Sequence, residues 1–338
     1  MRREARLTDQ TRVMERSAAG ATTMAFRLFG GRLFNLLRLL GESGYPIYER
    51  EIGYKAIHRQ LIVLIGVYGG LSSHEIVAVS GHEKAQVSRA IKPLEEAGLV
   101  QRGRLRGKLS LAPAGEQVYD RIIAIGRARD AELGAGLSDA ELKRFLAMTE
   151  SLTVAAAEIY ADERRLSMEA GIIGACANAA TPPSWPTGVR PAPPSLLAPR
   201  LFSLSAYFKR SAMLVYQRTH GLSQFQWQVL SLIGDHRPMP LAALIALMAR
   251  DKSQIGRTVG HLEQAGLITR TRPTRRRDIV LEITPEGHTI FDAMFRIAEQ
   301  REARLMAGHD ADDRAFYDAV IARLTANAAA MLEQETGR

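Results

Sequence analysis

The sequence predicts a mainly α-helical protein with small β-hairpins, built from two copies of one unit in tandem. The run KAQVSRAIKPLEEAGLVQR at 84–102 returns at 252–270 as KSQIGRTVGHLEQAGLITR. Between the copies, the segment 181–200 holds seven prolines, and proline at that density excludes helix interiors and sheet ladders. We therefore expect a first domain at 25–165, an Ala/Gly-rich and then Pro-rich linker at 166–200, and a second domain at 201–335.

The spacing of apolar residues predicts the helices of the first copy. In order, they begin near Phe26 and then cover 59–67, 72–80, 83–97, 116–129 and 141–159. Gly98 suits the left-handed position that follows a helix C-terminus. Apolar and basic residues alternate over 99–111, as in a two-stranded hairpin. Pro113 suits the first turn of the next helix, and Ser138 with Asp139 is expected to cap the last one.

The second copy has the same order of elements, with a hairpin four residues longer, because Pro113-Ala-Gly matches Pro285-Glu-Gly. A length difference confined to a hairpin indicates a surface loop. Helix, turn, helix and then a basic hairpin is the plan of a winged helix-turn-helix. We therefore expect two tandem winged helix-turn-helix domains that pair as an intramolecular pseudo-dimer.

Positive charge is concentrated in matching windows of the two copies. The formal net charge is +9. The window 82–108 has seven bases and three acids, a net +4, and the window 250–277 has eight bases and two acids, a net +6. The rest of the chain is close to neutral. Two matched basic regions on a balanced scaffold indicate a polyanionic partner, most simply double-stranded DNA.

The second helix of each helix-turn-helix carries small and polar side chains on one face, as the major groove requires. In the first copy these candidate DNA contacts are Lys84, Gln86, Ser88 and Arg89. In the second copy they are Lys252, Ser253, Gln254, Gly256 and Arg257. Gln and Arg suit adenine and guanine, whereas Lys and Ser more often contact phosphates. The alternative is that these residues form only the solvated face of an amphipathic helix.

Each hairpin is a basic wing. The candidate phosphate or minor-groove contacts are Arg102, Arg104, Arg106 and Lys108 in the first wing and Arg270, Arg272, Arg275, Arg276 and Arg277 in the second. Arginines this close repel one another unless an external anion is near. The alternative is a solvated charged turn.

These motifs resemble the multiple-antibiotic-resistance regulator (MarR) family of bacterial transcription factors. The resemblance rests on the run 254–259, on LEQAGLI at 262–268 and on the Arg-rich wing that closes with VLEITPEG at 280–287. The resemblance implies a regulator of transcription, namely a repressor that responds to a small aromatic ligand. Family members are usually homodimers paired through terminal helices on palindromic operators, so further homo-oligomerisation stays open.

The chain departs from the family pattern in three places. Arg275 stands where the wing usually has an acid, and Ala112 replaces the threonine found at Thr284. Pro93 lies inside the first recognition helix, where proline costs about 3 kcal/mol and kinks the axis. We therefore expect the first copy to bind DNA more weakly and the operator to be asymmetric.

Other candidates are weaker. Cys176 lies between the domains, and an inert thiol is favoured over a redox sensor. His58, His74 and His82 are too dispersed for a metal site. Tyr216, Phe225 and Trp227 have core spacing, although a ligand pocket between them and the terminal helices stays open. We expect neither a metal nor a cofactor.

Several classes of protein are disfavoured by the sequence. No apolar run approaches the roughly 20 residues of a membrane helix, the N-terminus resembles no signal peptide, and a single cysteine suits a reducing cytoplasm. Without a phosphate-binding loop, nucleophile elbow or paired carboxylates, we expect no enzyme. Two alternatives remain: an architectural winged-helix module that binds proteins, and a ligand sensor that has lost DNA binding.

Overall fold

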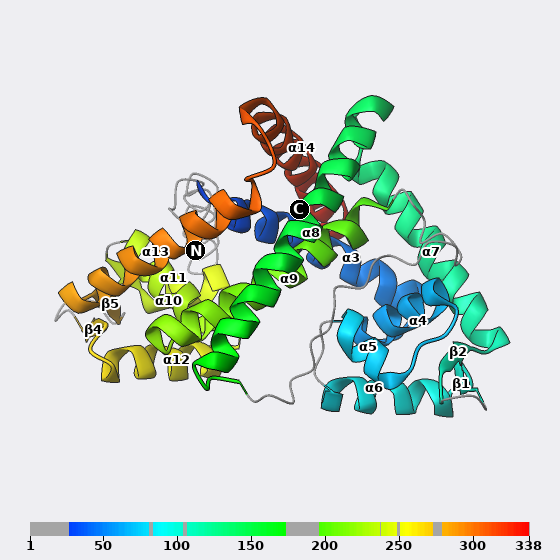
Figure 1. The fold of residues 1–338 in the computed structure, drawn as a ribbon, viewed down its shortest axis with the longest axis horizontal. Helices are drawn as coiled ribbons and strands as arrows, with labels where there is room; N and C mark the ends of the chain where they lie inside the picture. The colour runs from blue at the N-terminus through cyan, green and yellow to red at the C-terminus, as the bar shows by residue number, and fades with distance from the viewer. Residues whose placement is uncertain are drawn as a thin grey trace, which may run out of the picture. The chain divides into compact units, whose positions relative to one another are not determined.

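The winged-helix order of elements appears in both repeats (Figure 1). The computed structural model describes residues 27–80, 84–103, 107–173, 196–236, 238–248, 251–272 and 279–337. The first repeat contains α3 (Phe29–Glu51), α4 (Ala56–Tyr68), α5 (Ser73–Ser80), α6 (Lys84–Glu96), β1 (Val100–Arg102), β2 (Leu109–Leu111), α7 (Pro113–Leu133) and α8 (Asp139–Glu169). The second contains α9 (Leu197–His220), α10 (Gln224–Asp235), β3 (Met239–Pro240), α11 (Leu241–Met248), α12 (Lys252–Gln264), β4 (Ile268–Thr271), β5 (Val280–Ile283), α13 (Pro285–Leu305) and α14 (Ala311–Thr336). The predicted mainly helical fold with two winged helix-turn-helix units is confirmed.

The chain forms two compact units, and each unit takes segments from both repeats. Among the described residues, the first-wing unit has those within 33–161, 196–207 and 309–337. The second-wing unit has those within 27–32, 162–173 and 208–308. The ends of each repeat therefore belong to the unit built around the other repeat.

In the first-wing unit, the C-terminal helix of the second repeat packs on helices of the first. Tyr317 of α14 is fully buried and stacks on Phe145 of α8, with ring centroids 4.6 Å apart. The hydroxyl of Tyr317 lies 3.0 Å from Oγ1 of Thr149, within hydrogen-bond distance. The Asn327 side chain donates to the carbonyl of Leu133 at the end of α7 (2.7 Å). Both apolar packing and buried hydrogen bonds therefore hold α14 against the first repeat.

The start of each repeat's first helix is bound by a carboxylate of the other repeat. In the first-wing unit, the Leu197 N–H at the start of α9 donates to Asp130 of α7. In the second-wing unit, the Phe29 N–H at the start of α3 donates to Glu302 of α13 (2.7 Å). The first N–H groups of a helix lack partners within it and attract negative charge. Asp130 and Glu302 therefore anchor the exchanged helix starts in the same way.

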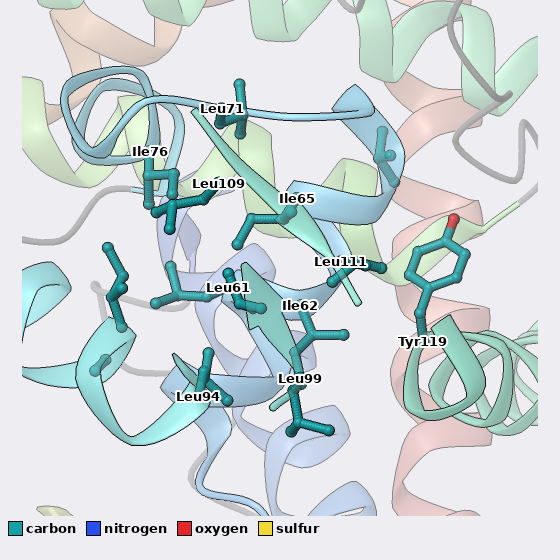
Figure 2. Packing of buried hydrophobic residues seen from close by; sticks show 14 of the residues in the cluster. Leu61, Ile62, Ile65, Leu71, Ile76, Leu94, Leu99, Leu109, Leu111 and Tyr119 are labelled. Carbon is teal, nitrogen blue, oxygen red and sulfur yellow. The ribbon is translucent and has the colours of Figure 1, made fainter. Parts of the chain in front are cut away.

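The core of the first winged helix comes from α4, α6, the hairpin and α7. Leu61, Ile62 and Ile65 of α4 are buried and face the hairpin and α6 (Figure 2). Their neighbours in the same cluster include Leu94, Leu99, Leu109, Leu111 and Tyr119. Burial of such side chains stabilises the fold by roughly 1.5–3 kcal/mol each, so the core fixes α6 and the wing strands together.

Each wing has a third backbone segment that the sequence did not indicate. In the second repeat, β3 pairs with β5 through Met239 and Leu281, which gives the strand order β3-β5-β4. In the first repeat, Leu71 and Leu109 form a single antiparallel bridge with N–H to carbonyl distances of 2.9 and 2.7 Å. The two-stranded hairpin that we predicted is therefore incomplete. The segment before the third helix pairs with the hairpin, a contact that local alternation does not reveal.

A glycine lets the helix after each wing approach the turn after the recognition helix. A Cβ atom on Gly115 would lie 1.9 Å from the Leu99 carbonyl oxygen, and one on Gly287 would lie 2.0 Å from that of Leu267. Both distances are far inside van der Waals contact, so no other residue fits without backbone movement. The repeated Pro-x-Gly sequence is thus required by close packing of backbone on backbone.

Three helices differ from the sequence prediction. Pro93 does not interrupt the first recognition helix, because α6 continues to Glu96 and has 13 residues, the same as α12. Pro93 has no N–H to donate to the Arg89 carbonyl, so it removes one backbone hydrogen bond of the helix, and its side chain is exposed. Helix α8 extends to Glu169, and α9 begins at Leu197, inside the segment predicted as linker.

Two helices of the second repeat have side-chain caps that their counterparts in the first repeat lack. Ser223 forms a capping box with Gln226 at the start of α10, whereas the matching Lys55 makes no side-chain cap on α4. At the start of α13, Thr284 Oγ1 accepts from the Gly287 N–H at 3.0 Å. Ala112 gives α7 no such bond.

Replacement of Gly287 by alanine is expected to destabilise the protein by about 1–3 kcal/mol, the usual cost of forcing atoms into a packed site. The control is Gly260→Ala in α12, where a Cβ meets nothing within 4 Å and alanine should stabilise the helix by up to about 1 kcal/mol. Urea unfolding measures both. Equal effects of the two substitutions would contradict the packing argument.

Loss of the α13 cap in Thr284→Ala is expected to cost about 1 kcal/mol and to speed amide exchange in the first turn of α13. Thr289→Ala is a matched control, because Thr289 lies on the same helix and its hydroxyl only donates to the Pro285 carbonyl (3.1 Å). Unchanged exchange in Thr284→Ala would show that the cap contributes nothing.

Candidate nucleic-acid interface

Helix α6 has an exposed polar face and a buried apolar face. The predicted contacts Lys84, Gln86, Ser88 and Arg89 are all exposed. On the opposite side Val87, Ile91 and Leu94 are at most 2% exposed and belong to the core of the first winged helix. The core therefore holds α6 with its polar stripe toward solvent.

Helix α12 repeats this arrangement. Lys252, Ser253, Gln254, Gly256 and Arg257 are exposed, and on the other face Ile255, Val259 and Leu262 are fully buried. Asp251 caps the helix by accepting from the Gln254 N–H at 3.0 Å. A Cβ on Gly256 would meet nothing within 4 Å, so this position leaves open space on the stripe.

The first arginine of each wing is engaged in an ion pair. Arg102 Nε lies 2.7 Å from Oε1 of Glu95 at the end of α6. At the matching positions, Arg270 Nη2 lies 3.2 Å from Oε2 of Glu263 in α12. Lys108 Nζ lies 4.0 Å from Glu75 Oε1, and Arg272 is exposed. The other predicted wing residues, Arg104, Arg106, Arg275, Arg276 and Arg277, lie outside the described residues.

The aromatic residues noted in the second repeat are packed together. Tyr216 is 4% exposed, its ring centroid is 5.8 Å from that of Trp227, and Trp227 is 5.7 Å from Phe291. Phe225 packs against the same core. The core interpretation of these residues is therefore confirmed.

The histidine and cysteine candidates do not form a site in the described part of the chain. Within the described ranges no three potential metal ligands gather. Burial, followed by the charge of Lys55, lowers the pKa of His58. His82 and Cys176 fall outside the described residues. Across that same part of the chain, no helix is long and apolar enough to cross a membrane.

The first-wing unit contains a cavity of about 230 Å³ that sequence reasoning missed. Its wall is mainly apolar, and Tyr48, Arg129, Asp130 and Arg200 are the lining residues with polar or charged groups. The remaining wall residues are Leu40, Val63, Val67, Ile122, Ile123, Gly126, Leu133, Leu196, Ala198, Pro199 and Phe202. They come from α3, α4, α7 and the start of α9. A lining from four separate segments has no local sequence pattern.

Hydrogen bonds to Ser43 fix the side chain of Arg129 in the cavity wall. Arg129 donates to Ser43 Oγ (2.8 Å) and to the Ser43 carbonyl (3.2 Å). In the second-wing unit, Arg301 donates in the same way to Ser211 Oγ (2.6 Å). The repeated Arg and Ser residues at these positions were the one sequence feature that could have indicated the cavity. They were not considered because they lie outside the helix-turn-helix motif.

Asp130 is the titrating group of this cavity. Burial raises the pKa of Asp130 to about 6, although hydrogen bonds from the Leu197 and Ala198 N–H groups and the charge of Arg129 act in the opposite direction. Burial also raises the pKa of Tyr48. The carboxyl group that binds the start of α9 therefore changes charge near neutral pH.

Two tandem winged helices with exposed polar faces on their second helices define a tandem winged helix-turn-helix protein. Models described as the MarR family match residues 52–107 and 222–277. The chain thus carries two MarR-family segments in tandem.

Individual relatives are similar over parts of the chain. A proposed transcriptional regulatory protein for the hcr operon of Thauera aromatica is 37% identical over 70 residues, which are 20% of this chain and 42% of that relative. The match spans less than half of that curated protein. A crystal structure of MarR is 26% identical, covers 36% of this chain and 91% of that one, and has a TM-score of 0.33. FabT of Streptococcus pneumoniae in complex with DNA is 16% identical over 35% of this chain and 85% of that one, also with a TM-score of 0.33.

The raised pKa of Asp130 predicts the pH dependence of stability. The folded state holds the proton up to about pH 6, whereas the unfolded chain releases it near the ordinary value of about 4. The contribution of Asp130 to the free energy of unfolding should therefore fall as pH rises from about 4 to about 6. Asp130→Asn should remove this slope in urea unfolding series, and Asp120→Asn, an exposed site on the same helix, should leave it unchanged. An identical slope in Asp130→Asn would contradict the assignment.

Proposed function

We propose that the protein is a sequence-specific regulator of transcription that binds double-stranded DNA in the cytoplasm, as a repressor that responds to a small molecule. The observation that carries this proposal is the pair of matched polar stripes on α6 and α12, each backed by a buried apolar face. Stripes of Lys, Gln, Ser and Arg suit base edges and phosphates in the major groove. The surplus of positive charge in both windows supports a polyanionic partner.

The exchange of terminal segments supports an intramolecular pseudo-dimer. Asp130 binds the start of α9 and Glu302 binds the start of α3, so each repeat contributes to the unit of the other. Paired winged helices contact half-sites one helical turn apart, about 34 Å. A single chain would then supply both recognition helices of one operator.

The two recognition helices differ at the positions that would contact bases. Ser88 of α6 corresponds to Gly256 of α12, and Ala85 corresponds to Ser253. Different side chains favour different bases, so the operator should be asymmetric. The equal lengths of α6 and α12 support DNA contact by both copies.

The cavity beside α9 supports a small effector. Its apolar wall with a few polar groups is typical of a ligand site, and about 230 Å³ suits a small aromatic molecule. Leu196 and Phe202 line it close to Leu197, whose N–H binds Asp130. A ligand there would act on the anchored helix start, and so on the pairing of the repeats.

Substitution of a recognition-helix arginine should weaken binding to an operator obtained by selection from random duplexes. We expect Arg257→Gln and Arg89→Gln each to cost about 1–3 kcal/mol and to relax base preference at one position of one half-site. Fluorescence anisotropy on single-base operator variants measures both effects. Arg296→Gln, an exposed arginine on α13, is the control and should bind like the wild type.

One result would overturn this function, and another would contradict only the asymmetry of the operator. Absence of any salt-sensitive duplex binding by the full chain would favour a protein-interaction module or a sensor without DNA binding. A strictly palindromic footprint with equal loss in both arginine variants would contradict the asymmetric operator alone.

A further inference from the structure

The pairing of the first wing arginine with the recognition helix occurs at matched positions in both repeats. Arg102 approaches Glu95 with two nitrogens, Nε at 2.7 Å from Oε1 and Nη2 at 3.5 Å from Oε2. Arg270 approaches Glu263 at 3.2 Å. Many surrounding residues differ between the repeats, whereas both the glutamates and the arginines are the same. The fold therefore builds the same link twice.

The link spans a tight turn. Gly98 and Gly266 end the recognition helices with φ values of +67° and +72°. After them, the Leu99 N–H donates to the Leu94 carbonyl (2.9 Å) and the Leu267 N–H to the Leu262 carbonyl (3.0 Å). The backbone thus fixes where each strand starts, and the ion pair fixes the third residue of that strand to the last turn of the helix.

Arg102 is the last residue of β1, and Arg270 is the last but one of β4, so both lie close to the wing turn. Arg102 is opposite Leu109, which is fully buried, on the neighbouring strand. Arg270 is opposite Leu281, also fully buried, and one further strand pair follows it. Each arginine therefore lies where core-anchored strands give way to the basic turn. A side-chain link at this point sets the direction of the turn relative to the recognition helix.

Charge and energy favour positioning over direct contact with DNA. A half-exposed ion pair contributes only about 0–1 kcal/mol to stability, so the pair is not needed for the fold itself. The nearby carboxylate neutralises each arginine and would repel a phosphate that approached it. Arg272 lies two residues beyond Arg270 and is exposed. Within the described residues, Arg272 forms no ion pair with a carboxylate.

We propose that Glu95 and Glu263 are positioning residues for DNA binding. Their ion pairs with Arg102 and Arg270 hold each wing against its recognition helix. This assignment rests on the proposed DNA-binding function and refines it, because it removes two arginines from the set of direct phosphate contacts. The remaining contacts of the second wing then begin at Arg272.

The test uses the full chain, a selected duplex and a series of salt concentrations. Glu263→Gln adds one unit of positive net charge, yet we expect it to weaken binding several-fold with an unchanged salt dependence. Arg270→Gln should weaken binding by a similar factor, also without change in salt dependence, and the double variant should be no worse than either single one. Arg272→Gln, the matched control, should reduce the slope of log affinity against log salt by about 1.

The charge-swapped variant Glu263→Arg with Arg270→Glu should recover most of the lost affinity. Tighter binding by Glu263→Gln, together with a slope reduced by about 1 in Arg270→Gln, would overturn the proposal and make Arg270 a phosphate contact.

A readout without DNA separates this proposal from the function on which it rests. Amide hydrogen exchange in β4 and β5 should accelerate in Glu263→Gln and in Arg270→Gln but not in Arg272→Gln. If the wild-type chain binds no duplex, the proposed function fails, and the exchange data alone decide whether the pair holds the wing. Unchanged exchange in both variants would overturn the positioning role.

Discussion

The close approach of Gly115 to the Leu99 carbonyl, and of Gly287 to that of Leu267, is the constraint around which each winged helix is organised. It brings the helix after the wing against the turn that ends the recognition helix. Neighbouring backbone bonds complete this junction, since Ala112 and Thr284 donate to the same two carbonyls at 2.9 and 3.0 Å. Recognition helix, wing and following helix thus share one rigid joint, and side chains on all three keep fixed mutual positions.

The second organising feature is the exchange of helix ends. A helix start has unpaired N–H groups and a partial positive charge, and a carboxylate from the other repeat satisfies it in each unit. In the first-wing unit the acceptor also borders the cavity. Proton binding and pairing of the repeats are therefore coupled through Asp130, and in the proposed function the same carboxyl group would couple both to an effector in the cavity.

The sequence was sufficient for what depends on local pattern. Apolar periodicity placed α6 to within a residue at each end, the internal repeat carried the same order of elements to the second copy, and the identities around Leu262 and Gly266 indicated the winged helix. The exposed stripes also followed from periodicity.

Features formed by residues far apart in the sequence were not predicted. These are the third segment of each wing, which includes Leu71 and Met239, and the cavity. The expectation that Pro93 would interrupt the first recognition helix was wrong. Helix propensity alone does not show that the buried side chains of Ile91 and Leu94 hold the helix against the core. The DNA contacts themselves stay a prediction.

The joining of both winged helices in one chain changes what a single substitution does. In an assembly of two identical subunits, each substitution appears twice, so an altered base preference at one half-site is always accompanied by the same alteration at the other. Here Ser88 and Gly256 already differ at matched positions, while the exchanged anchors at Asp130 and Glu302 keep the halves together. In the proposed function, each half could therefore acquire its own target sequence without loss of the shared framework.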